Sequence, residues 1–206
     1  MTGDLSTSVQ HLAGRFPVLD AIMRVAAADL VVAVLVVVIL AWCHPDGLRT
    51  VAAIGVGGLV ALALGALSGA LWPEQRPFVA GHFTPLIPHS ADASFPSDHL
   101  LALGAVTGAT WRRMRGLAVV TSVLSVIVAF ARVLVGVHYV GDVAGGFAIG
   151  LACGAAAWLA LAPLTPLLAR IDRLLRRRVR PVLWGRARTV GGSGARAAPR
   201  QLHDEP

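Results

Sequence analysis

An arginine, a histidine and an aspartate occur close together in an otherwise apolar stretch, ARVLVGVHYVGD, at residues 131–142. They are Arg132, His138 and Asp142. Ionisable side chains are costly at membrane depth, so those that occur there are candidates for a functional site. His138 and Asp142 are four residues apart, which on a helix places them on one face, one turn from each other. The carboxylate can then bind one imidazole nitrogen and leave the other as a nucleophile or a base. The alternative is a buried His–Asp pair with a structural role.

Two other segments carry polar groups that can complete such a site. The first is Arg76-Pro77, and the second is the run SFPSDH at residues 94–99. Guanidinium groups bind phosphate oxygens through a fork of N–H donors, and a serine at a helix start turns its hydroxyl toward an anion. Of two histidines, one can attack phosphorus while the other protonates the departing oxygen. A phosphoryl-transfer site is therefore predicted from Arg76, Ser97, His99, Arg132 and His138.

The composition is that of a membrane protein. Of the 206 residues, 56% are hydrophobic and only 14% are charged, against about one quarter in soluble domains. The net charge of +7 comes from eighteen arginines without any lysine. Most of these arginines lie in one tail and one short loop, which favours a membrane-topology signal over nucleic-acid binding. The sequence has no metal-site spacing of Cys and His, no P-loop and no G-x-S-x-G motif.

The apolar segments predict an all-α, polytopic membrane bundle of about five transmembrane helices. The expected spans are residues 26–43, 51–71, 96–111, 117–130 and 140–161. Residues 1–25 mix polar and apolar positions and predict an N-terminal interfacial helix. We expect a membrane domain at 26–166, followed by a basic cytoplasmic tail at 167–206 that is largely disordered at its end.

Arginine placement predicts the orientation. Fourteen arginines lie in the turn at 44–50, the loop at 112–116 and the tail, and four lie on the other side. Because positive charge marks the cytoplasmic side, the polar loop at 72–96 and the stretch at 131–142 are expected at the same outer face. The three segments of the predicted site therefore meet there.

Taken in order, the three segments resemble the signature of the type 2 phosphatidic acid phosphatase (PAP2) superfamily: K-x6-R-P, P-S-G-H and S-R-x5-H-x3-D. This sequence has R-P at 76–77, P-S-D-H at 96–99 and A-R-x5-H-x3-D at 131–142. The resemblance implies a PAP2/haloperoxidase-like core. It makes His138 a nucleophile that forms a phosphohistidine, Asp142 the group that orients it and His99 the general acid. It also implies a phosphate-binding set of Arg76, Arg132, Ser97 and Asp98, and no metal or other cofactor.

Three positions depart from that signature. The lysine falls at Gly69, the glycine of the second segment is Asp98, and the serine before Arg132 is Ala131. We expect the carboxylate of Asp98 to point away from a bound anion. The missing lysine leaves open a non-catalytic protein that binds lipid phosphate.

Three segments of the sequence are similar to the bacitracin-resistance branch of the family: R-P-F, S-F-P-S-D-H and H-L-A-G-R-F-P-V-L-D. That similarity implies hydrolysis of undecaprenyl diphosphate at the outer face of a bacterial inner membrane, which recycles the lipid carrier of the cell wall. A phosphatidate or phosphatidylglycerophosphate phosphatase is the alternative enzyme. The expected partners are the lipid substrate and membrane lipid, not nucleic acid, and the oligomeric state is left open.

The outer loop contains further ionisable residues that we expect to lie outside the site. His82 and His89 are expected to face solvent, with contact to the diphosphate or to a head group as the alternative, and Glu74 and Asp92 are expected to be loop charges. Glu74 is close enough to Arg76 in sequence to pair with it.

Overall fold

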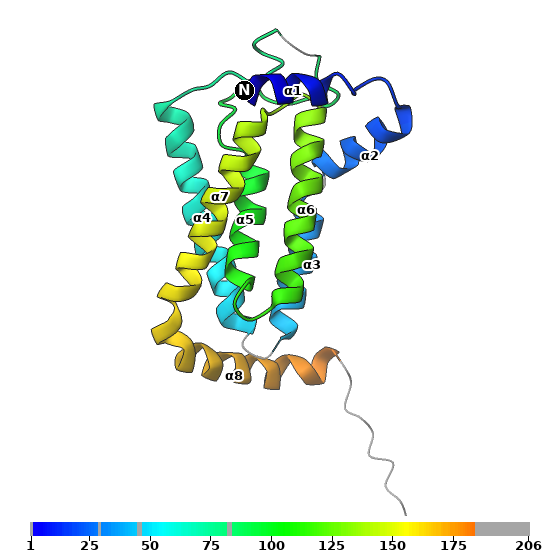
Figure 1. Cartoon of the computed structure of the whole chain (residues 1–206). Helices are drawn as coiled ribbons and strands as arrows, with labels where there is room; N and C mark the ends of the chain where they lie inside the picture. The colour runs from blue at the N-terminus through cyan, green and yellow to red at the C-terminus, as the bar shows by residue number, and fades with distance from the viewer. Residues whose placement is uncertain (1, 29, 45–46, 82–83, 184–206) are drawn as a thin grey trace, which may run out of the picture. The chain divides into compact units, whose positions relative to one another are not determined.

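A computed structural model describes residues 2–28, 30–44, 47–81 and 84–183 (Figure 1). The described residues form helices and contain no β-strand, which confirms the predicted all-α fold. The elements are α1 (Thr2–Gln10), α2 (Pro17–Ala28), α3 (Leu30–Cys43), α4 (Gly47–Leu71), α5 (Asp98–Thr110), α6 (Arg115–Leu134), α7 (Val140–Ala160), the 3-10 helix η1 (Ala162–Leu164) and α8 (Thr165–Leu183). Residues 1–172 form one compact unit. Residues 173–206 form a second unit, and the predicted disorder at its end falls on 184–206, outside the described residues.

Three of the described helices, α4, α6 and α7, are long and apolar enough to cross a membrane. They also expose large apolar side chains: Leu59 of α4 is 71% exposed and Val126 of α6 is 70% exposed. Such side chains suit contact with lipid tails rather than water. The other two predicted spans are occupied by α3 and α5, which have 14 and 13 residues, fewer than the roughly 20 that a spanning helix needs. Asp29, near the start of the first predicted span, lies outside the described residues.

The N-terminal region forms two helices where one was predicted. Gly14 adopts a φ of +79°, a left-handed conformation that favours glycine, and Pro17 then begins α2. The main-chain N–H of Gly14 donates to Oδ2 of Asp20 at 3.0 Å and secures the turn. Helix α1 packs against α6 and α7, and the N–H of Val140 donates to the hydroxyl of Ser6 at 3.0 Å. The chain thus folds α1 onto the end of the bundle where α7 begins.

Helix α5 lies at the centre of the bundle and packs against α4, α6 and α7 (Figure 1). Every residue from Leu100 to Thr110 is buried except Ala102, which is half-buried. The backbones of α5 and α7 approach so closely that a Cβ added to a facing glycine would overlap main-chain atoms of the other helix. These glycines are Gly104, Gly108, Gly150 and Gly154. Close glycine-mediated contact of this kind is how membrane helices associate without a hydrophobic driving force.

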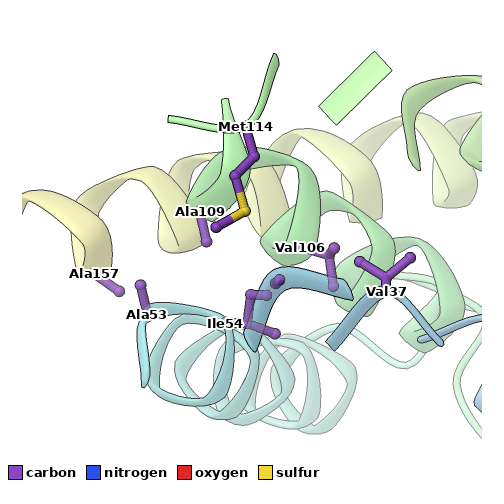
Figure 2. Close-up of a cluster of buried hydrophobic side chains, with 8 residues drawn as sticks. Val37, Ala53, Ile54, Val106, Ala109, Met114 and Ala157 are labelled. Carbon is purple, nitrogen blue, oxygen red and sulfur yellow. The ribbon is translucent and has the colours of Figure 1, made fainter. Parts of the chain in front are cut away.

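A cluster of small and branched apolar side chains fills the space between α3, α4, α5 and α7, at the end of the helices where Met114 lies (Figure 2). It includes Val37, Ile54, Val106 and Ala157, and the side chain of Met114 joins it from the turn after α5. This packing fixes α5 against its neighbours, so the first turn of α5 has a defined position at the other end of the helix.

Candidate active site

The three predicted segments meet around His138, which is buried in the turn between α6 and α7. Its Nδ1 lies 2.9 Å from the main-chain oxygen of Ser94. Its Nε2 lies 3.2 Å from Nη1 of Arg76 and 3.2 Å from Nη2 of Arg132. One imidazole thus contacts all three parts of the sequence pattern.

The hydrogen bonds assign the tautomer of His138. A carbonyl oxygen can only accept, so Nδ1 carries the hydrogen and Nε2 has the free lone pair. Burial lowers the pKa of His138 to about 4, and the charges of Arg132 and Arg76 add to this effect while Asp142 opposes it. The imidazole is therefore neutral near pH 7, with the lone pair of Nε2 between two guanidinium groups.

Asp142 holds the turn around His138. Its Oδ2 accepts hydrogen bonds from the hydroxyl of Ser94 and from the N–H of Tyr139, and lies 3.4 Å from Nδ1 of His138. His138 and Asp142 are neighbours, as predicted, but Nδ1 of His138 lies closer to the main-chain oxygen of Ser94 than to the carboxylate of Asp142. Sequence reasoning included Ser94 in the second segment but gave it no role, because the group that binds the imidazole is a main-chain carbonyl, which no residue type marks.

Both arginines are buried and held by protein oxygens. Nε of Arg76 donates to Asp92 at 2.9 Å and its Nη1 donates to the carbonyl of Val137 at 3.0 Å. Nη1 of Arg132 donates to the carbonyl of Ala27, in α2, at 3.1 Å. These bonds fix each guanidinium so that a further N–H points at Nε2 of His138. Two fixed positive charges that converge on one point are suited to bind an anion such as phosphate.

Ser97 lies immediately before α5, and its side chain is fully buried. Its N–H donates to the carbonyl of Asp142 at 3.2 Å, which joins the second segment to the third. Its hydroxyl oxygen has no hydrogen-bond partner among the described residues. Leaving a buried polar group unpaired costs about 1–3 kcal/mol, so a bound phosphate that used this hydroxyl would recover that cost.

His99 and Asp98 occupy the first turn of α5 and lie in different environments. His99 is half-buried and close enough to Arg132, His138, His89 and Arg76 to interact with them electrostatically. Asp98 is exposed, and its Oδ1 lies beside Gly65 of α4, 3.8 Å from where a Cβ there would be. His99 therefore belongs to the cluster around His138. The carboxylate of Asp98 lies against α4 and is still close enough to Arg132 to interact with it electrostatically.

The expectation that His89 faces solvent is wrong. Its side chain is only 20% exposed, and its Nε2 lies 2.8 Å from Nη2 of Arg132. The loop turns inward because Leu86 and Ile87 pack on an apolar cluster that includes Ala27 and Val135. The N–H of Leu86 also donates to the carbonyl of Val135 at 3.0 Å. His82 lies outside the described residues.

Arg76 pairs with Asp92 rather than with Glu74, the neighbour that the sequence suggested. Burial acts to raise the pKa of Asp92, but hydrogen bonds from Ser90 and Arg76 outweigh it and hold that pKa below its usual range. Glu74 instead accepts the N–H of Ser94 at its main-chain oxygen, at 2.8 Å. Burial, with a smaller effect of Asp142, raises the pKa of Glu74.

Two features bear on the chemistry of the cluster. Among the described residues there is no group of three or more His, Cys, Asp or Glu that could hold a metal ion. Gly69, where the resemblance places a lysine, lies in α4, and a Cβ added there would be 3.1 Å from Cβ of Ala93. The positive charge around His138 therefore comes from arginines.

Comparison with known proteins gives the same family as the three segments. The model of the PAP2 superfamily matches residues 46–166. The chain is 30% identical to undecaprenyl-diphosphatase BcrC of Bacillus subtilis over 156 residues, which are 75% of this chain and 81% of that protein. It is 34% identical to putative undecaprenyl-diphosphatase YbjG of Escherichia coli over 124 residues, 59% of this chain and 62% of that protein.

Solved structures share the fold. The crystal structure of Aquifex aeolicus LpxE matches with a TM-score of 0.64 at 19% identity, covering 75% of this chain and 92% of that one. A PAP2-type phosphatidylglycerolphosphate phosphatase from Bacillus subtilis matches with a TM-score of 0.52 at 21% identity, covering 86% and 87%. At these identities the likeness concerns the fold alone.

Proposed function

Because this chain belongs to the PAP2 superfamily, we propose that it is a membrane lipid phosphatase acting on undecaprenyl diphosphate. The products are undecaprenyl phosphate and inorganic phosphate. The observation that carries the proposal is the position of His138, whose Nε2 lies 3.2 Å from guanidinium nitrogens of both Arg76 and Arg132. The choice of lipid is supported by two relatives named as undecaprenyl-diphosphatases, BcrC and the putative YbjG, which align with 75% and 59% of this chain.

In the first step the terminal phosphate of the lipid binds between Arg76, Arg132 and the hydroxyl of Ser97. Nε2 of His138 attacks phosphorus, an N–P bond forms, and the bond from phosphorus to the bridging oxygen breaks. His99 donates a proton to that oxygen, and undecaprenyl phosphate leaves. The two guanidinium groups stabilise the charge on the equatorial oxygens of the transition state.

In the second step His99 accepts a proton from water, which attacks the phosphohistidine. The N–P bond breaks, the electron pair returns to Nε2, and inorganic phosphate is released. Between the steps the phosphorylated imidazole is cationic. The carbonyl of Ser94 and the carboxylate of Asp142, on the Nδ1 side of the ring, stabilise that charge. No step in this scheme uses a metal ion.

The reaction is placed at the outer face of a bacterial inner membrane, where it returns the lipid carrier to cell-wall synthesis and confers resistance to bacitracin. The arginine distribution supports this orientation, because fourteen of eighteen arginines lie on the other side of the predicted spans. We also propose that the chain comprises an interfacial N-terminal region at 1–25, a phosphatase domain at 26–166 and a basic tail.

Phosphate release by the detergent-purified protein tests this function. Undecaprenyl diphosphate, phosphatidic acid and phosphatidylglycerophosphate are compared, each with and without EDTA, and His138→Ala is the matched control. We expect release that persists in EDTA, favours the diphosphate and disappears in the control.

The other outcomes separate the alternatives. Release only from phosphatidic acid or phosphatidylglycerophosphate keeps the histidine mechanism and moves the function to phospholipid metabolism. Release that EDTA abolishes contradicts the metal-free scheme. Binding of a lipid diphosphate without any release makes the chain a non-catalytic lipid-phosphate-binding protein.

A further inference from the structure

His89 and His138 contact the same nitrogen of Arg132. Nη2 of Arg132 lies 2.8 Å from Nε2 of His89 and 3.2 Å from Nε2 of His138. The two rings meet edge to face, with their centroids 6.2 Å apart. A phosphate oxygen that accepts a hydrogen bond from Nη2 beside His138 is therefore also next to Nε2 of His89.

The hydrogen bonds of His89 define its charge in the absence of an anion. Nδ1 lies 3.2 Å from the carbonyl of Ser90, which can only accept, so Nδ1 carries a hydrogen. Arg132 can only donate, so Nε2 has the lone pair and the ring is neutral. A neutral His89 thus presents to a phosphate oxygen a lone pair that repels it.

A bound anion would favour the protonated, cationic form of the His89 imidazole. Arg132 from α6 and Arg76 from the loop oppose a positive ring, and His138 and His99 add no negative charge. Asp92, whose Oδ1 is 3.9 Å from Nδ1, and the carbonyl of Ser90 favour it. Burial and the arginines hold the pKa of His89 below its usual range against these two groups. A phosphate dianion adjacent to Nε2 neutralises the opposing arginine charge and tips this balance.

We propose that His89 is a further ligand of the substrate phosphate, beside Arg76, Arg132 and Ser97. It takes up a proton from solvent as the anion binds and then donates a hydrogen bond from Nε2 to a phosphate oxygen. This role rests on the proposed function only in that the site binds phosphate. It makes phosphate affinity depend on pH through a residue other than the nucleophile and the general acid.

The test is binding of inorganic phosphate to the full-length detergent-purified protein, measured by equilibrium dialysis at about pH 6 and about pH 8.5. Wild type is compared with His89→Gln, with His89→Lys and with His11→Gln, an exposed histidine after α1. Ratios to wild type remove the titration of phosphate itself. We expect His89→Gln to weaken binding about tenfold at the lower pH, the value of one hydrogen bond to a charged group, and at most about twofold at the higher pH.

The two other variants fix the interpretation. His89→Lys carries its charge at both pH values, so it should bind phosphate at least as well as wild type at the higher pH, and His11→Gln should match wild type throughout. A His89→Gln protein that binds like wild type, or that is weakened equally at both pH values, overturns the proposal. Wild type that binds phosphate in this pattern but releases none from undecaprenyl diphosphate refutes the proposed function and leaves the role of His89 intact.

Discussion

Nδ1 of His138 donates to the main-chain oxygen of Ser94 at 2.9 Å, across 44 residues of sequence. The hydroxyl of the same serine donates to the carboxylate of Asp142. Ser94 therefore supports the predicted nucleophile in two ways. Its main-chain carbonyl binds the imidazole and is kept in any substitution, whereas its hydroxyl binds Asp142 and is lost in Ser94→Ala.

Ser94→Ala tests the second of these contacts. The imidazole keeps its carbonyl partner, but Asp142 loses one of its donors, so we expect kcat to fall about tenfold, the range of a hydrogen bond to a charged group. Asp142→Ala removes the carboxylate that balances the cationic phosphohistidine and should cost more, about a hundredfold. Initial rates of phosphate release measure both. Equal losses in the two variants would show that Asp142 acts only through Ser94.

Removing His138 should abolish turnover and removing His99 should reduce it severely, in both cases without preventing membrane insertion. His138→Ala lacks the attacking nitrogen, and loss of a general acid such as His99 typically costs about a hundredfold to ten-thousandfold. Rapid quenching with base of enzyme supplied with ³²P-labelled substrate should trap a labelled protein in wild type and none in His138→Ala. A labelled His138→Ala protein would place the nucleophile elsewhere.

The protonation state of His138 has a defined pH range. Its pKa of about 4 lies below the ordinary value, so the lone pair of Nε2 is present at neutral pH and is lost only as pH falls through about 4. In the unfolded chain the residue takes up its proton near pH 6.5. Between about pH 6.5 and pH 4 the unfolded chain therefore binds a proton that the folded protein does not, and the free energy of unfolding falls as pH is lowered through this range. Carbon-13 histidine NMR, assigned with His138→Ala, measures the midpoint. A value near 6.5 would contradict the burial of the ring.

The sequence was sufficient to predict that Arg76, His99, Arg132 and His138 lie at one end of the bundle. Each is a rare ionisable group in an apolar chain, and the alternation of spans assigns all of them to the same side. The carbonyl of Ser94 and the inward position of His89 were not predictable in this way. Both depend on a loop that folds back through long-range contacts, such as that between Leu86 and Val135, and such contacts leave no local pattern.

Helix lengths differ from the prediction for a related reason. An apolar run shows where a helix can lie but not where its ends are fixed. The main-chain carbonyl of Ser97 accepts hydrogen bonds from the N–H groups of Leu100 and Leu101 and so sets the start of α5. The N-terminal prediction likewise missed a break, because the left-handed conformation of Gly14 is a property of the turn rather than of the surrounding polar and apolar pattern.

The contact between α5 and α7 provides a prediction about stability with a matched control in the same chain. A Cβ at Gly150 of α7 would overlap the main-chain carbonyl of Leu101 in α5, whereas a Cβ at Gly58 of α4 would meet nothing within 4 Å. Gly150→Ala should therefore push the helices apart and lower the free energy of unfolding by about 1–3 kcal/mol. Gly58→Ala should leave stability unchanged or raise it by up to about 1 kcal/mol through helix propensity. Thermal unfolding in detergent compares the two variants with wild type. Equal unfolding temperatures for the two variants would contradict the close approach of α5 and α7.

The same pair of variants also predicts an effect on activity. The main-chain N–H of Ser97, immediately before α5, donates to the carbonyl of Asp142 in α7. Gly150→Ala should therefore also lower phosphate release, and Gly58→Ala should not.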